Sequence, residues 1–284
     1  MEPKATEWDL EIQHKSKFFD VNFKELWRYR DLMMLLVKRD YKASFKQTIL
    51  GPVWFFIQPI LTTFIYIVVF TNIARLGTDG KPAATFYLSG IILWNYFSTC
   101  LTTTSNTFVS NSNIFGKVYF PRLIMPMAVV VSNLAKFGIQ FSFFLAVLIY
   151  FLLAPEPQIQ VSWYVLLTPV FLFIIGLLGL SFGLIISSLT TKYRDVNHLV
   201  GFGVQLLMYA TPVVYPLSIV DEKYRTVLYL NPMTGIVEGF RYAFLGSGEL
   251  HLDLIAYSFG FAAVLFLFAI TIFSKVEKGF MDTV

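Results

Sequence analysis

Residues 162–188 read SWYVLLTPVFLFIIGLLGLSFGLIISS and contain no Asp, Glu, Lys or Arg. A helix needs about 20 mostly apolar residues to cross the hydrocarbon core of a bilayer, so this stretch is long enough to span one. The full charge-free run extends over residues 157–191. This segment therefore predicts a membrane-spanning helix within an integral membrane protein.

The composition of the whole chain supports the same interpretation. Of its 284 residues, 56% are hydrophobic and 14% are charged, whereas a soluble domain carries about 25% charged residues. A fold this apolar needs lipid around it. The net charge of +4 suits basic residues on the cytoplasmic side of a membrane better than nucleic-acid binding.

Five further stretches, working outward from residues 162–188, have the apolar length of a span. Together they predict an all-α integral membrane protein with six transmembrane helices. We place these helices near residues 53–74, 85–107, 123–153, 162–188, 198–218 and 252–274. Pro212 and Pro216 should interrupt the fifth helix, because proline removes a backbone donor and clashes with the preceding turn.

The distribution of Lys and Arg predicts the orientation of these helices. With the N-terminus inside, the cytoplasmic segments hold 16 of these residues and the outer segments hold 5, so both termini are expected in the cytoplasm. Residues 1–22 are expected to form a cytoplasmic tail, since they lack the apolar core of a signal peptide. Lys136 falls within the third span, where we expect it to snorkel to the cytoplasmic interface, with a lipid head-group contact as the alternative.

Residues 23–50 predict a different element, an amphipathic helix that is too charged to cross the membrane. Its apolar face consists of Leu26, Tyr29, Met33, Leu36 and Val37. A helix of this type lies along the membrane surface. It would serve either as a plain anchor for the first span or as a docking surface for a cytoplasmic partner, and residues 51–284 would form the transmembrane domain.

Residues 212–253 lie outside by this topology but are rich in apolar and aromatic residues. The dipeptide Asn231-Pro232 is expected to break a helix. We therefore predict two short re-entrant gate helices near residues 213–250, divided at this dipeptide. Irregular backbone at membrane depth is tolerated only beside protein or a water-filled cavity, so the segment is expected near a pore exit.

The sequence lacks the motifs that would give the chain an enzymatic activity of its own. It contains no Walker A loop, no H-E-x-x-H motif and no G-x-S-x-G motif. Cys100 is the single cysteine and the three histidines lie far apart, so we expect no metal site, no catalytic residue and no cofactor in this chain. The predicted spans hold essentially no carboxylates for an ion relay, so energy for uphill transport would enter through another subunit.

Four groups of motifs resemble, in the same order, the membrane subunits of bacterial ABC polysaccharide exporters. They are residues 38–42 with 45–54 and Gln58-Pro59; residues 118–122 with Met125-Pro126; residues 193–196 with 211–216; and residues 231–234 with Glu238, Phe240-Arg241 and Leu245-Gly246. These motifs cover roughly residues 23 to 280.

The resemblance implies a homodimeric permease in the bacterial cytoplasmic membrane, paired with two ATP-binding cassette ATPases that bind the ATP and magnesium. The implied cargo is an undecaprenyl-pyrophosphate-linked polysaccharide such as O-antigen, capsule or teichoic acid. An interface helix, a cytoplasmic coupling turn and outer gate helices are implied as well. The alternatives are a permease for a smaller lipid or drug, a membrane-embedded transferase and an accessory assembly protein.

Three sets of candidate site residues follow from position and residue type. A mixed-charge helix with protruding aromatics suits a groove on an ATPase, which gives the coupling set Arg28, Arg30, Asp31, Lys38, Arg39, Asp40, Phe115, Lys117, Tyr119, Phe120 and Arg122. Sugars stack on aromatic rings, which gives the channel set Trp54, Gln58, Tyr66, Trp94, Asn95, Tyr96, Gln205 and Tyr209. The periplasmic gate set is Tyr215, Tyr229, Glu238, Arg241 and Tyr242.

Each set has a plainer alternative. The basic residues of the coupling set would also be attracted to anionic lipid, and Trp and Tyr collect at the interfaces of any membrane protein. Glu238 and Arg241, three residues apart, are expected to pair along one helix face, either at the exit or as a structural cap. The carrier pyrophosphate would be attracted by Arg28, Arg30, Lys42 and Lys46.

Overall fold

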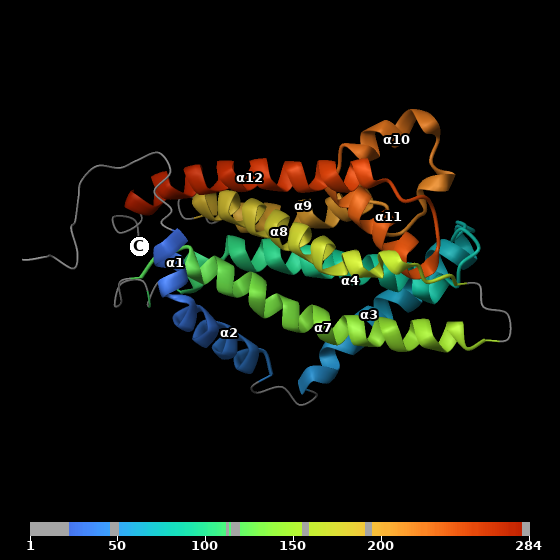
Figure 1. The fold of residues 1–284 in the computed structure, drawn as a ribbon, viewed down its shortest axis with the longest axis horizontal. Helices are drawn as coiled ribbons and strands as arrows, with labels where there is room; N and C mark the ends of the chain where they lie inside the picture. Colours follow the sequence, from blue (N-terminus) through green and yellow to red (C-terminus); the bar gives the residue numbers. More distant parts are fainter. Residues whose placement is uncertain are drawn as a thin grey trace, which may run out of the picture.

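The computed structural model describes residues 23–45, 51–111, 114, 120–154, 159–190 and 195–279, which form helices and short connections without a β-strand. The central bundle contains α4 (Ala83–Ser105), α7 (Ile124–Leu152), α8 (Thr168–Thr190) and α12 (Leu252–Gly279). α8 packs between α4 and α12, and α4 also packs on α7. Figure 1 shows α1 (Phe23–Arg28) and α2 (Arg30–Phe45) at one end of the bundle, and α10 (Glu222–Tyr229) and α11 (Pro232–Leu245) at the other.

Four helices in the described part of the chain are long and apolar enough to cross a membrane. They are Trp54–Ile73, Ile124–Leu152, Trp163–Thr190 and Leu252–Lys275. The first joins α3 (Trp54–Tyr66) to the π-helix η2 (Ile67–Ile73), and the third begins with the 3-10 helix η3 (Trp163–Leu167). All four coincide, within a few residues, with predicted spans.

The other two predicted spans are helical but differ from an ordinary span. α4 has 23 residues, and most of its side chains are buried although they include several Ser and Thr. α9 (Val196–Tyr209) has only 14 residues, a rise of about 21 Å against a bilayer core of about 30 Å. It stops well short of the predicted end at residue 218, because Pro212 and Pro216 follow.

α8 approaches α4 closely through two glycines. A Cβ atom at Gly179 would lie 2.6 Å from Cβ of Cys100, and one at Gly183 would overlap the side chain of Thr104. Small residues allow this approach in lipid, where van der Waals packing drives helix association. The main hydrophobic core surrounds the contact and includes the fully buried Phe171.

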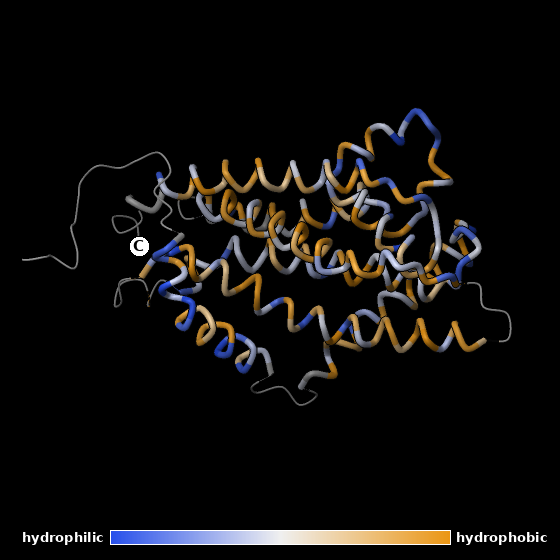
Figure 2. Tube along the Cα trace, in the orientation of Figure 1, coloured by the Kyte–Doolittle hydropathy of each residue, from blue (hydrophilic) through white to orange (hydrophobic). Residues whose placement is uncertain are grey.

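The N-terminal helix lies against the start of α7. α1 and α2 are nearly continuous, with an interruption at Tyr29. All five residues of the predicted apolar face belong to a second hydrophobic cluster that includes Ile124 and Leu184, so protein rather than lipid covers this face. Figure 2 shows hydrophilic residues concentrated on α1, α2 and around α10, while the bundle helices are mostly hydrophobic. Residues 1–22 and 46–50 of the predicted tail and helix lie outside the described residues.

The connection after α9 contains α10 and α11, which divide at Asn231-Pro232 as predicted. Oδ1 of Asn231 accepts a hydrogen bond from the Met233 amide at 3.0 Å and so caps the first turn of α11. Nδ2 of Asn231 donates to the Ala210 carbonyl at 3.1 Å and to Thr211 Oγ1 at 2.8 Å. One side chain therefore starts α11 and fixes it to the end of α9.

Candidate functional site

Arg39 joins α2 to the segment that leads into the predicted coupling turn. Its Nη2 lies 2.8 Å from Oδ1 of Asp40 and donates to Oδ1 of Asn111 at 3.3 Å. The predicted turn residues Phe115, Lys117 and Tyr119 lie outside the described residues. The structure thus brings the first part of the coupling set next to the entrance of the turn.

Phe120 does not protrude as predicted. It is 5% exposed and packs in the same cluster as Leu36 and Ile124. An aromatic side chain buried in this way anchors the turn to α2 and α7 and is not available to a partner. Arg122, two residues later, is partly exposed.

A second face of the N-terminal helix is exposed. We define the coupling face as Trp27, Arg28, Arg30, Asp31, Met34, Leu35 and Lys38. Trp27 is 69% exposed and Leu35 is 62% exposed, and the Arg30 guanidinium lies 5.5 Å from the Trp27 ring. The prediction had the charged residues of this face but missed its apolar ones. The sequence did contain a signal for these apolar residues. Trp27, Met34 and Leu35 recur at helical spacing on the side of the helix opposite the buried face.

A polar crevice opens between α3, α4 and α7, with a volume of about 180 Å³. Its polar lining consists of Gln58, Asn95, Ser98, Thr99, Asn133, Lys136 and Gln140, and Phe55, Tyr96 and Phe137 complete it. Nδ2 of Asn95 donates to Oε1 of Gln140 at 3.4 Å, a bond that links α4 to α7. Three residues of the predicted channel set, Gln58, Asn95 and Tyr96, therefore meet in one place.

The other members of the channel set separate into three groups. Trp54 on α3 and Gln205 and Tyr209 on α9 are exposed at the surface of the single chain. Tyr66 is half-buried and its hydroxyl donates to Sδ of Met208 at 3.4 Å, which connects α3 to α9. Trp94 is 5% exposed and packs on Phe97 in the main core, which argues against its predicted channel role.

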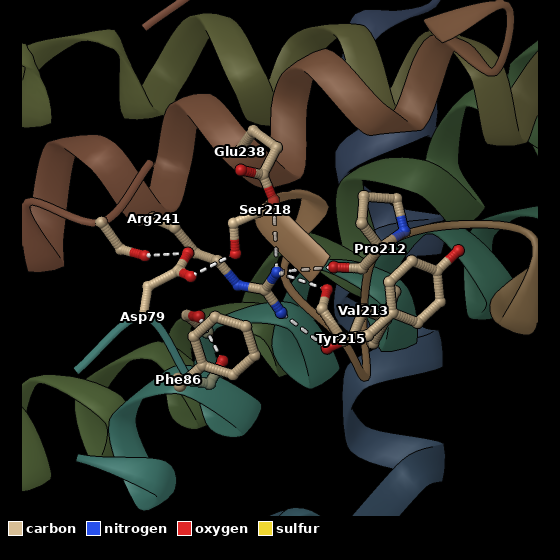
Figure 3. A network of polar contacts seen from close by, with 10 residues as sticks. Asp79, Phe86, Pro212, Val213, Tyr215, Ser218, Glu238 and Arg241 are labelled. Atoms are coloured by element: carbon tan, nitrogen blue, oxygen red, sulfur yellow. Dashed lines mark hydrogen bonds and ion pairs between the residues drawn. The ribbon is translucent and has the colours of Figure 1, made fainter. Parts of the chain in front are cut away.

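Arg241 is the centre of a buried polar cluster between α11, α4 and the segment after α9 (Figure 3). Its side chain is 1% exposed, and Nη1 and Nη2 donate to the carbonyls of Pro212 and Val213, each at 2.6 Å. The guanidinium carbon lies 3.8 Å from the ring centroid of Phe86, within the range of a cation–π contact. A Cβ at Gly90 would come within 3.0 Å of Nη2, so the small residue leaves room for the guanidinium.

Glu238 pairs with Arg241 as predicted, with 3.3 Å between Oε1 and Nη1. Burial raises the pKa of the Glu238 carboxyl, and the positive charge of Arg241 acts in the opposite direction. Both side chains are buried, which favours the structural cap over a pair that lines an opening. Nearby, Asp79 accepts hydrogen bonds from Ser218 at 2.5 Å and Ser247 at 3.2 Å (Figure 3). Asp79 lies between η2 and α4, so these bonds join that connection to the cluster as well.

The three tyrosines of the gate set make separate contacts. The Tyr215 hydroxyl donates to the carbonyl of Tyr209 at 3.2 Å. Tyr242 packs on Tyr164 at 5.9 Å between ring centroids, and Tyr229 lies 6.1 Å from the His251 ring. The sequence indicated the Glu238–Arg241 pair through its spacing, but it carried no signal that the Arg241 side chain binds the carbonyls of the preceding connection.

Sequence comparisons with known proteins identify relatives of the chain over most of its length. The sequence model of the family described as ABC-2 type transporter matches residues 31–245, from α2 through α11. The O-antigen export system permease protein RfbA from Myxococcus xanthus is 30% identical over 267 residues, which is 92% of this chain and 98% of the relative. The protein of the same name from Klebsiella pneumoniae is 26% identical over 254 residues, 89% of this chain and 94% of the relative. The inner membrane transport permease YadH from Escherichia coli (strain K12) is 24% identical over 232 residues, 78% of this chain and 87% of the relative.

Proposed function

Because this chain belongs to the ABC-2 type transporter family, we propose that it is the permease subunit of a bacterial exporter for a lipid-linked polysaccharide of the O-antigen type. The observation that carries the proposal is the similarity to two O-antigen export permeases, which extends over nearly the whole length of each protein. A shared loop or a single shared helix would not support a common cargo in this way. The polymer would be carried on undecaprenyl pyrophosphate across the cytoplasmic membrane.

ATP hydrolysis would take place in a separate ATP-binding cassette subunit that docks on the coupling face. This face combines exposed apolar residues with Arg30, Asp31 and Lys38, the mixture expected where a helix enters a groove of another protein. The buried side of α2 packs on α7, and Ser132 Oγ lies 3.5 Å from the Val37 carbonyl. A movement of α2 would therefore be transmitted directly to α7 and the transmembrane bundle.

The functional unit would be a homodimer of six-span chains with both termini in the cytoplasm. The first span, Trp54–Ile73, supports the dimer, since only 11% of its apolar stretch is buried within one chain and the rest is open to a second copy. Gln205 and Tyr209 on α9 are also exposed, and a second copy would turn such surfaces into the wall of a pathway. α10 and α11 would close the outer end as gate helices, with Arg241 holding α11 to the connection after α9.

A permease for a smaller lipid or drug is the second candidate, and the more distant similarity to a transport permease without a stated cargo is compatible with it. Deleting the gene and extracting the polyprenyl-linked lipids separates the two. Polysaccharide export predicts that polymer of full length accumulates on its lipid carrier inside the cell and disappears from the surface. Unchanged surface polymer in the deletion strain would exclude the proposed cargo.

A further inference from the structure

Lys136 lines the polar crevice, and none of the other lining residues is a carboxylate. Lys136 is half-buried in the first half of α7, a membrane-spanning helix, close to where α7 packs on α2. Among the described residues it forms no hydrogen bond or ion pair, so the crevice residues leave its charge unbalanced. A cation at this position is costly unless an anion or water reaches it, and ionisable residues inside spans commonly mark a binding site.

Asp40, an acidic residue on the neighbouring helix α2, already has a partner. The negative charge of Asp40 on α2 acts on Lys136, but the two side chains form no ion pair, and the Asp40 carboxylate is bound to Arg39 at 2.8 Å. The other polar groups of the crevice are all neutral amides and hydroxyls; they belong to Gln58, Asn95, Ser98, Thr99, Asn133 and Gln140. These groups can donate hydrogen bonds to an anion but cannot balance the charge of Lys136.

The depth of the crevice suits a lipid head-group. Lys136 is one helical turn, about 6 Å, beyond Ser132, whose hydroxyl contacts the backbone of Val37 on α2. We expect a charged helix such as α2 at the level of the head-groups, and the exposed Trp54 at the start of α3 is a residue typical of the same level. The long side chain of Lys136 would carry its ammonium from the α7 backbone to that level.

We propose that the crevice between α3, α4 and α7 binds the anionic phosphate of a lipid head-group through Lys136. The crevice, at about 180 Å³, is far larger than the ~10–15 Å³ that a single water needs, so a phosphate group fits beside the ammonium. Two membrane lipids carry this chemistry, a bulk anionic phospholipid and a polyprenyl pyrophosphate. The inference goes beyond the proposed function, because a phospholipid would bind whether or not the cargo is a polysaccharide.

Native mass spectrometry of the full chain in detergent tests the proposal with three lipid probes. The probes are phosphatidylglycerol, phosphatidylcholine and undecaprenyl pyrophosphate, and the variants are Lys136→Met and Lys136→Arg. Lys223→Met is the matched control, since it removes the same charge from exposed α10 at the other end of the bundle. Lys136→Met should bind at least one of the two anionic lipids about fivefold more weakly, equivalent to about 1 kcal/mol, while Lys136→Arg and Lys223→Met bind it as the wild type does.

The two anionic probes distinguish the source of the phosphate. A loss confined to phosphatidylglycerol assigns the site to bulk phospholipid, and a loss confined to undecaprenyl pyrophosphate assigns it to the carrier. Phosphatidylcholine, which has no net charge, should bind all variants equally. Binding of both anionic lipids by Lys136→Met within twofold of the wild type would overturn the proposal.

A second measurement uses the wild-type chain and does not depend on the folding of a variant. Amine acetylation at Lys136, measured by peptide mass spectrometry, should be slowed by the anionic lipid that binds, while acetylation at Lys223 is unchanged. Equal labelling of Lys136 with and without both lipids would overturn the proposal. An absence of labelling even without lipid would also overturn it, because the crevice would then be closed to ligands.

Discussion

The substitution Arg241→Met should strongly destabilise the outer end of the bundle. Arg241 is 1% exposed, and its loss would leave the Glu238 carboxylate, itself 6% exposed, buried without its partner. Removing one member of a buried ion pair costs about 3–5 kcal/mol. The carbonyls of Pro212 and Val213 would also lose their 2.6 Å donors, but these losses overlap with that of the pair and are not additive. We therefore expect a loss of about 3–5 kcal/mol in the free energy of unfolding.

Thermal unfolding of the purified chain in one detergent, followed by circular dichroism, measures this effect. For domains of roughly this size, 1 kcal/mol corresponds to about 2–4 °C, so the midpoint should fall by roughly 6–20 °C. Two further variants identify the cause. Arg241→Met combined with Glu238→Gln should recover part of the loss because no unpaired charge stays buried, and Arg241→Lys should lie between wild type and Arg241→Met because it keeps the charge but not the planar fork.

The refuting results are specific. If Arg241→Met unfolds within about 1 kcal/mol of the wild type, the cluster does not hold α11 to the connection after α9. If the double variant is as unstable as Arg241→Met alone, the orphaned charge of Glu238 is not the source of the loss, and the reasoning about the buried pair is wrong.

Three other predictions concern helix packing, the coupling face and the α11 cap. Gly179→Ala should lower stability by about 1–3 kcal/mol in thermal unfolding, because its Cβ would lie 2.6 Å from Cys100 Cβ, whereas Gly260→Ala in open space should be neutral or slightly stabilising. Lys38→Glu should reduce co-purification of the ATPase subunit severalfold, and Lys223→Glu on α10 should not; equal co-purification would remove the docking role. Asn231→Ala should lower the free energy of unfolding by about 0.5–2 kcal/mol, because the N-cap of α11 is lost. Asn231→Asp should keep the capping bond from the Met233 backbone amide but lose the two bonds that the Asn231 side chain donates to Ala210 and Thr211.

The parts of the fold that the sequence predicted are those governed by local physical rules. Charge-free length located four helices that are long and apolar enough to span a membrane, because the bilayer sets that length. Helical periodicity identified the face of α2 that contains Leu36 and Val37. Proline chemistry located the break at Asn231-Pro232, because proline cannot continue a hydrogen-bonded helix. It also predicted an interruption of the fifth span at Pro212, but α9 already ends at Tyr209.

The parts that were missed depend on which neighbour covers a side chain. In a membrane protein the lipid-facing and protein-facing residues are both apolar, so hydropathy cannot tell a core residue such as Trp94 or Phe120 from an exposed one such as Trp27. The spacing of Glu238 and Arg241 predicted their pairing. It did not predict that Arg241 would bind the Pro212 carbonyl, because that contact joins residues 29 positions apart through the tertiary fold.

Reconstituted transport tests the central claim most directly. The chain would be placed in proteoliposomes with its ATPase subunit and a lipid-linked polysaccharide, and the polymer that becomes accessible on the opposite face would be measured with and without ATP. The account predicts ATP-dependent transfer of the polymer that stops when the chain is left out. ATP hydrolysis without any transfer of polymer, in vesicles that contain both subunits, would contradict it.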